Sequence, residues 1–316
     1  MTERTAEMRD TSLLSAAVVL GVVVSMALSP VGLPLAAMGI AGLTYRGRAV
    51  VAAVSSAIGV AGVAILEPTS VIFVAPALVA VFLAVVMLVR VDAQWVGAML
   101  TFVIGAAAAA RDFVFYRASG SSITAELAQE INRWVAQNAQ SAAGAGGERA
   151  VRETANMLLS LIPMMYFFTG LITAVVVIIG IRWAANRSDR TVKVPTLSHL
   201  DLTPHVLWPF IFGLFALAAS YGPVANPTLW RTVGLNLVLC VRALFALQGF
   251  GVAAGVLDRT RVGLGGRILA LAALAVIDVF TLAVSFIGLI DFWVNFRRLP
   301  RDGATPSSPA AAVSDR

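Results

Sequence analysis

Two charged residues lie inside long apolar runs of the sequence, where a charge is costly. Arg242 is near the middle of "LNLVLCVRALFALQGFGVAAGVL", and Asp278 is at mid-depth in "LALAALAVIDVFTLAVSF". A charge at the centre of a membrane helix costs about 2.5–3.5 kcal/mol on insertion scales, so it normally faces a partner or a water-filled cavity. The chemistry open to these residues is therefore an intramembrane ion pair, or the binding of a polar solute.

The spacing of the two runs predicts that these charges meet. Only the short connection "DRTRVGLGG" joins the runs, so they are expected to be antiparallel neighbours. Arg242 is 15 residues from Leu257, which precedes that connection, and Asp278 is 14 from Leu264, near its end. At a rise of about 1.5 Å per residue the two depths agree. We predict an Arg242–Asp278 ion pair facing the bundle interior, with Thr281 and Ser285 extending the same helical face.

Two interpretations of these polar residues stay open. In the structural one, the ion pair merely locks two helices together. In the functional one, the residues line a central polar pocket that holds a small solute, and Asn236 and Gln248 contribute from the Arg242 helix. The candidate substrate-binding residues are Asn236, Arg242, Gln248, Asp278, Thr281 and Ser285.

The last apolar run ends in "GLIDFWVNFRRLPR", which combines a carboxylate, aromatic residues and arginines. Asp291 and Asn295 are four residues apart and Arg298 is seven from Asp291, so on a helix their side chains could bond near the water boundary. The aromatic residues suit a membrane interface, and the arginines are expected to meet phosphate headgroups. We predict a structural anchor, not a catalytic carboxylate, formed by Gly288, Asp291, Asn295, Arg297 and Arg298.

Patterns typical of catalysis are absent from the sequence: there is no H-E-x-x-H, G-x-S-x-G, Walker loop or C-x-x-C. "HLDLTPH" holds His199, Asp201 and His205, but ligands so spaced in a loop are a weak metal signal. Asp278 and Asp291 would lie about 20 Å apart on a continuous helix, too far to share a proton. We expect no enzymatic activity, no metal and no cofactor.

Composition places these residues in a membrane protein. The 316 residues are 59% hydrophobic and 13% charged, against roughly 25% charged in soluble domains. Apolar runs fall at about 12–29, 31–45, 49–66, 70–89, 94–110, 156–181, 205–223, 229–257 and 265–296. The second run is short and carries Pro34, so it is either re-entrant or packed against its neighbours. We predict an all-α polytopic membrane helical bundle with about 8–10 transmembrane helices.

The predicted organisation is one integral membrane domain over residues 1–297 and a tail at 298–316 that is disordered by composition. An extramembrane insert covers 111–155 and lies outside in the simplest topology. Within it, a helical repeat places Ile123, Leu127 and Ile131 on one face. The favoured interpretation is a helix lying in the membrane interface; the alternative is a lid over an external cavity.

Basic residues at the ends of the runs predict a cytoplasmic N-terminus in a bacterial plasma membrane. Topology and lipid headgroups explain the net charge of +6 better than nucleic acid, for which no supporting pattern exists. Nine simple crossings would nevertheless put Arg297, Arg298 and Arg301 outside, against the positive-inside rule. Either one segment does not cross, or the last segment breaks and returns its tail to the cytoplasm.

Small residues recur every four positions at Ala17, Gly21 and Ser25. Such ridges let helix backbones approach closely in lipid. The favoured interpretation is packing within the chain, and the alternative is a docking surface for another membrane subunit. The lipid bilayer is the other expected partner.

Three segments of the C-terminal third, "LWPFIFGLFALAAS", "GLNLVLCVRALFALQGFGV" and "GLIDFWVNFRR", resemble the YybS-like family of uncharacterised bacterial membrane proteins. The matching positions are Pro209, Asn236, Gln248, Gly249, Gly288, Asp291 and Arg297. That family is distantly similar to the substrate-binding membrane subunits of energy-coupling-factor vitamin transporters. The resemblance implies a helical bundle with a solute pocket and a partner module that hydrolyses ATP.

Two functions from different classes follow. The first is a membrane protein that binds or transports a small solute in a polar intramembrane pocket. The alternative is a non-transporting membrane scaffold, or a partner subunit of a cell-envelope complex. A solute-binding protein needs a polar site open to one side, whereas a scaffold can be packed solid.

Overall fold

In the computed structural model, all regular secondary structure among the described residues is helical. These residues are 3–138, 153–154, 156–188, 191–192, 194, 196–260 and 262–300. The all-α fold class is therefore confirmed. The chain forms two compact units: the first comprises Met1–Val194 and His205–Val241, and the second comprises Pro195–Pro204 and Arg242–Arg316. The expectation of one membrane domain over 1–297 stays a prediction.

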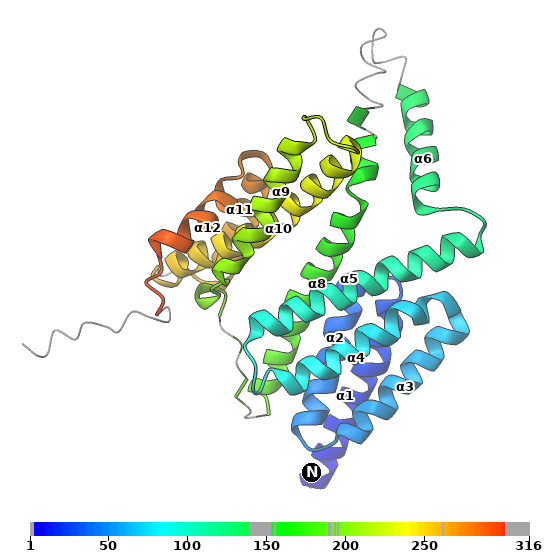
Figure 1. The fold of residues 1–316 in the computed structure, drawn as a ribbon. Coiled ribbons are helices and arrows are strands. Elements are labelled where there is room, and N and C mark those ends of the chain that lie inside the picture. Colours follow the sequence, from blue (N-terminus) through cyan, green and yellow to red (C-terminus); the bar gives the residue numbers. More distant parts are fainter. Residues whose placement is uncertain are drawn as a thin grey trace, which may run out of the picture. The chain divides into compact units, whose positions relative to one another are not determined.

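The first unit contains most of the helices (Figure 1). They are α1 (Glu3–Ser25), α2 (Ser29–Tyr45), α3 (Ala49–Leu66), α4 (Val71–Met87), α5 (Ala93–Ala118), α6 (Ile123–Asn138), α8 (Ile162–Asn186) and α9 (Leu207–Ala219). Short 3-10 turns lie at Pro68–Ser70, Leu197–His199 and Pro204–Val206. The long helix α10 (Pro227–Asp258) begins in the first unit and ends in the second, which also holds α11 (Leu264–Thr281) and α12 (Ala283–Val294).

Six helices within the described ranges are long and apolar enough to cross a membrane: α1, α3, α4, α5, α8 and α10. The bent pair α11 and α12 makes a seventh if it is counted as one span. The remaining apolar runs form α2, of 17 residues, and α9, of 13 residues. The protein is thus a multi-helix membrane protein, and the count of 8–10 crossings stays a prediction.

The small-residue ridge of α1 packs against α2. A Cβ atom added at Gly21 would overlap the backbone of Ala36, and one added at Gly32 would overlap the backbone of Ser25. Gly21 and Ser25 are buried and Ala17 is half-buried. The ridge therefore serves packing within the chain, which was the favoured interpretation, and Gly21 and Ser25 are not available as a docking surface.

Ion pairs close the far end of the α1–α2 hairpin. Arg46 Nη1 lies 3.2 Å from Asp10 Oδ2, and Arg48 pairs with Glu7. Because residues just after α2 meet residues near the start of α1, α2 returns along α1. The second apolar run is therefore a helix packed against its neighbours, which was one of the two alternatives. Arg46 and Arg48 lie at the end of the hairpin where α1 begins.

The core of the first unit lies among α2, α4, α5 and α8, which pack side by side (Figure 1). Its largest fully buried side chains include Leu33, Ile40, Phe73, Leu100 and Ile181. These residues come from apolar runs of the sequence, which are typical of membrane helices. The core thus holds the helices of the first unit up to α8 together.

The predicted insert of 111–155 starts within α5, which continues to Ala118, and the helical pattern inside the insert corresponds to α6. Ile123 and Ile131 are half-buried and Leu127 is 36% exposed. Residues 139–152 and 155, and the side chains of 134–138, lie outside the described residues. The choice between an interfacial helix and a lid therefore stays a prediction. The predicted tail at 298–316 likewise lies outside the described part from residue 301 onward.

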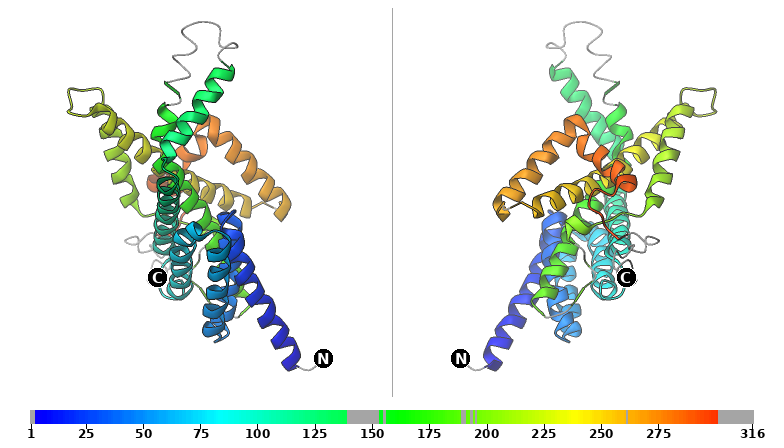
Figure 2. Two further views of the ribbon diagram at one scale, coloured as in Figure 1. Left: turned by 90° about the vertical axis from the view of Figure 1, so that its right-hand side faces the viewer. Right: turned by 90° about the vertical axis from the view of Figure 1, so that its left-hand side faces the viewer.

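The last apolar run is broken inside the second unit. The break is at Leu282, whose φ of 59° is left-handed, and α11 and α12 meet there at 96°. Figure 2 shows the two helices as the sharp orange corner. A continuous helix was assumed when Thr281 and Ser285 were placed on one face and Asp278 and Asp291 about 20 Å apart. That assumption is wrong because the last segment breaks at Leu282, and the return of its tail to the cytoplasm stays a prediction.

Two glycines bring α12 into backbone contact with α10. A Cβ atom added at Gly288 would overlap the carbonyl oxygen of Phe245, and one added at Gly249 would overlap that of Val284. Beside this crossing the rings of Phe245 and Phe292 meet edge to face, with centroids 5.9 Å apart. The close approach fixes how the polar side chains of the two helices meet.

Candidate functional site

The predicted ion pair between α10 and α11 is present. Arg242 Nη2 donates to the carbonyl oxygen of Asp278 at 2.9 Å and lies 3.4 Å from its carboxylate Oδ2. The Arg242 side chain is 29% exposed and that of Asp278 is 9% exposed. The positions of Arg242 and Asp278 relative to the connection between the two runs thus predicted this contact correctly.

The Asp278 carboxylate also caps the start of α12. The Ser285 backbone N–H donates to Oδ1 at 2.8 Å, and the Ser285 hydroxyl donates to Oδ2 at 2.8 Å. An anion at a helix N-terminus is stabilised by the unpaired N–H groups and the helix dipole. Ser285 therefore does meet Asp278, but it does so because the chain turns at Leu282.

Thr281 does not join this group. It is exposed, its hydroxyl donates to the carbonyl of Ile277 at 2.9 Å, and the Ala283 N–H lies 3.3 Å from its oxygen. The prediction that Thr281 extends the Asp278 face fails because α11 ends at this residue. Thr281 instead satisfies backbone groups at the break.

A second polar cluster surrounds Gln248, which is fully buried on α10. Its Nε2 donates to Asp201 Oδ1 at 2.9 Å and to Asp291 Oδ2 at 3.0 Å. Its Oε1 accepts from the Leu202 N–H at 3.1 Å. Asp291 is fully buried and also accepts from the Phe296 N–H at 2.8 Å. Gln248 thus bridges α12 and the connection that precedes α9.

Arg297 completes this second cluster. Its Nη2 donates to Asp291 Oδ2 at 2.7 Å, and its Nη1 donates to the carbonyls of Leu200 at 2.5 Å and Ser198 at 3.3 Å. Nη2 also lies 3.6 Å from Asp201 Oδ1. The side chain is only 4% exposed, so the expectation that Arg297 meets headgroups is wrong. Charge-assisted bonds of this kind are strong in a buried site.

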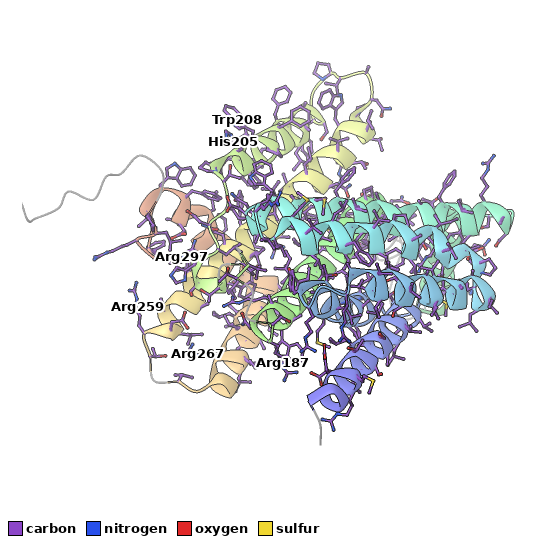
Figure 3. The ribbon with its side chains drawn as sticks, turned by 90° about the horizontal axis from the view of Figure 1, so that it is seen from below. Arg187, His205, Trp208, Arg259, Arg267 and Arg297 are labelled. Carbon is purple, nitrogen blue, oxygen red and sulfur yellow. The ribbon has the colours of Figure 1, made fainter. Side chains whose placement is uncertain are left out.

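Arg297 turns inward because α12 ends at Val294. Asn295 is left-handed, with a φ of 48°, and its side chain bonds the N–H and carbonyl of Leu299 at 2.9 and 2.8 Å. The expected side-chain bonding of Asp291, Asn295 and Arg298 along one helical face therefore does not form. Arg298 is exposed. In Figure 3, Arg297 lies apart from Arg259 and Arg267, which flank the turn between α10 and α11.

Asn236 lies in the first unit, and its side chain is bonded to other groups than Arg242. Its Nδ2 donates to the carbonyls of Ser160 at 2.7 Å and Thr232 at 2.8 Å, and its Oδ1 accepts from the Met164 N–H at 2.9 Å. These bonds tie α10 to the start of α8. The structure does not place Asn236 among the Arg242 contacts.

The histidines form no metal constellation in the described part of the chain. His199 Nδ1 lies 2.7 Å from Thr196 Oγ1, and Asp201 is bonded to Gln248. No group of three or more His, Cys, Asp or Glu side chains within the described residues could hold a metal ion.

Sequence reasoning missed the role of Asp201 and of the backbone at Ser198–Leu202. Their partners are 46 or more positions away in the chain, so no helical period could indicate them. The signal that pointed here was the motif behind the family resemblance. Its positions Gln248, Gly249, Gly288, Asp291 and Arg297 all meet in this cluster and the adjoining helix crossing.

The family described as "Predicted membrane protein (DUF2232)" matches residues 11–292. No curated protein and no solved structure shows significant similarity to the chain.

Proposed function

This chain belongs to the DUF2232 family of predicted membrane proteins, and we propose that it binds a small solute at Arg242, inside a bacterial plasma membrane. The proposal assigns no catalysis to the chain. One observation carries it: an accessible charged side chain meets the broken backbone of the last apolar run.

The depth of Arg242 supports this site. Within α10, Arg242 is 15 residues after Pro227 and 16 before Asp258, or about 22–24 Å from each end at 1.5 Å per residue. Its partner Asp278 lies one turn before the break at Leu282. Irregular backbone at membrane depth is tolerated where it is buried in protein or lines a cavity, and broken helices commonly form solute sites in transporters.

The accessibility of Arg242 distinguishes it from Arg297. The Arg297 side chain is 4% exposed, and both of its Nη atoms donate to protein acceptors, while its buried Nε has no partner among the described residues. The Arg242 side chain keeps 29% of its exposure. We assign Arg297, Gln248 and Asp291 to the framework and Arg242 to the solute.

The resemblance of this region to the YybS-like family supports the same assignment. Because that family is distantly similar to substrate-binding subunits of energy-coupling-factor transporters, transport driven by a partner that hydrolyses ATP belongs to the proposal. A second candidate, a non-transporting scaffold, is favoured by the buried network around Arg297, as expected in a solidly packed unit.

Ligand-induced stabilisation tests the proposal. Purified protein would be heated with pools of small metabolites sorted by charge, because a ligand that binds only the folded state raises Tm. At least one pool should raise the Tm of the wild type and leave that of Arg242→Gln/Asp278→Asn unchanged. This double variant removes both charges together, so neither is left unpaired. Equal responses of the two proteins, or no response to any pool, would favour the scaffold.

A further inference from the structure

We propose that the solute group recognised by Arg242 is an oxyanion, a carboxylate or a phosphate. This inference rests on the proposed function and names the chemical class of its ligand. The argument compares how fully the two members of the ion pair are already bonded.

The acceptors of Asp278 are largely occupied. Its two carboxylate oxygens accept the N–H and O–H of Ser285, each at 2.8 Å, at the N-terminus of α12. Its carbonyl oxygen accepts from Arg242. A cationic or hydroxyl-donating solute would find these oxygens already engaged, so Asp278 is poorly suited to recognise one.

The donors of Arg242 are largely unused. A guanidinium carries five N–H donors, and among the described residues only Nη2 of Arg242 donates to the protein. Nε and Nη1 have no acceptor within that part of the chain, and the side chain is partly exposed. The planar edge of a guanidinium matches two oxygens of a carboxylate or phosphate. The unused edge therefore fits an oxyanion.

The positive charge of Arg242 is also weakly compensated. Its Nη2 lies 3.4 Å from the Asp278 carboxylate, whereas the corresponding distance from Arg297 to Asp291 is 2.7 Å. Because Ser285 and the start of α12 already stabilise the Asp278 charge, a second anion beside Arg242 would not have to displace this carboxylate. The pair at the break would thus hold Arg242 in place and leave its outer edge free.

Binding of defined probes to the purified full-length protein tests this class. Inorganic phosphate and succinate are compared with glycerol, which is neutral, and choline, which is cationic. We expect saturable binding of phosphate or succinate. Arg242→Lys keeps the charge but loses the paired N–H donors of the guanidinium, so it should weaken that binding by at least about tenfold. Arg242→Gln/Asp278→Asn should abolish it.

The outcomes separate this inference from the proposed function. If glycerol or choline binds in a manner that the double variant abolishes, while both oxyanions fail, the solute site stands and the oxyanion class is overturned. If Arg242→Lys binds as tightly as the wild type, recognition of the oxyanion by the guanidinium edge is overturned. If neither oxyanion binds the wild type, the inference also fails.

A phosphate could belong to a free solute or to a lipid headgroup. Protein in vesicles of phosphatidylcholine is therefore compared with protein in vesicles that also contain phosphatidic acid. Unchanged phosphate binding in both identifies a free solute. Loss of phosphate binding in the second, together with stabilisation that depends on Arg242, identifies the lipid. Either result supports an oxyanion site.

Discussion

Arg297 and Arg298 are adjacent arginines with opposite environments. The Arg297 side chain is 4% exposed and pairs with the fully buried Asp291, whereas Arg298 is exposed. Removing one partner of a buried ion pair costs about 3–5 kcal/mol because the other charge is left uncompensated. We expect Arg297→Met to lower the unfolding free energy by about that amount, and Arg298→Met to change it by less than about 0.5 kcal/mol.

Denaturant unfolding in detergent, followed by circular dichroism, measures both variants. Similar losses of stability in the two would show that the buried position of Arg297 does not matter, contrary to the framework role assigned to it. The comparison is matched because both substitutions remove the same charge from neighbouring positions.

Gly288 lies where α12 touches the backbone of α10. An alanine there would overlap the carbonyl oxygen of Phe245, whereas an alanine at Gly265 in α11 would meet nothing within 4 Å. Overpacking of a close contact costs typically about 1–3 kcal/mol. We expect Gly288→Ala to lower Tm clearly and Gly265→Ala to leave it unchanged or raise it slightly, because alanine favours helix. Comparable Tm values in thermal melts of the two variants would contradict this crossing.

At the level of elements, the break at Leu282 is the feature with the largest consequence. A left-handed φ of 59° suits glycine and is unfavourable for a β-branched residue. We therefore expect Leu282→Gly to keep or raise Tm and Leu282→Ile to lower it. In an uninterrupted helix the order would reverse, because glycine is a poorer helix former than isoleucine. The order of the two Tm values decides between a helix broken at Leu282 and an uninterrupted one.

The sequence predicted which segments are helices and which charges meet between neighbouring runs. The apolar runs were sufficient to predict the helices, and the short connection between two of them was sufficient to predict the charge pair, because both features are local in the sequence. It did not predict that α11 ends at Thr281, since "DVFTLAVSF" contains no proline or glycine to mark a break. Every error about Thr281, Asn295 and Arg297 follows from extending a helical period across a helix end.

At the level of the whole molecule, the break bears on membrane topology. Asp278 meets Arg242 at the middle of α10, whereas Arg297, after α12, lies against Gly251 and Gly255, nearer the C-terminal end of that helix. The chain thus moves back toward the connection between α10 and α11 after the break. We predict that α11 and α12 enter and leave the membrane on one side, so that the terminal arginines share the side of Arg259.

Reporter fusions test this topology. An alkaline phosphatase or green fluorescent protein fused after Val262 and another fused after Leu299 should report the same, cytoplasmic, side. This placement would satisfy the positive-inside rule, which nine simple crossings violate. Opposite sides for the two fusions would show that α11 and α12 together cross the membrane.

The candidate site was harder to predict than the fold. The pairing of Arg242 with Asp278 followed from depth alone, whereas the contacts of Asp201, Gln248 and Arg297 join segments far apart in sequence. Such contacts depend on how the chain between α8 and α9 packs against α10, which no local pattern encodes. Sequence could name the polar residues but not divide them into a framework and an accessible cation.

Water access at position 242 tests the central claim most directly. In a background of Cys240→Ala, which removes the only cysteine, Arg242→Cys/Asp278→Asn is treated with a charged, membrane-impermeant thiosulfonate. Because a thiolate, which forms in water, attacks the reagent and displaces its sulfinate, we expect labelling at least about tenfold faster than at Phe280→Cys. Phe280 is an apolar position of α11 that is 81% exposed and should face lipid. Labelling of position 242 no faster than of position 280 would mean that Arg242 is closed to water, and the solute site would be contradicted.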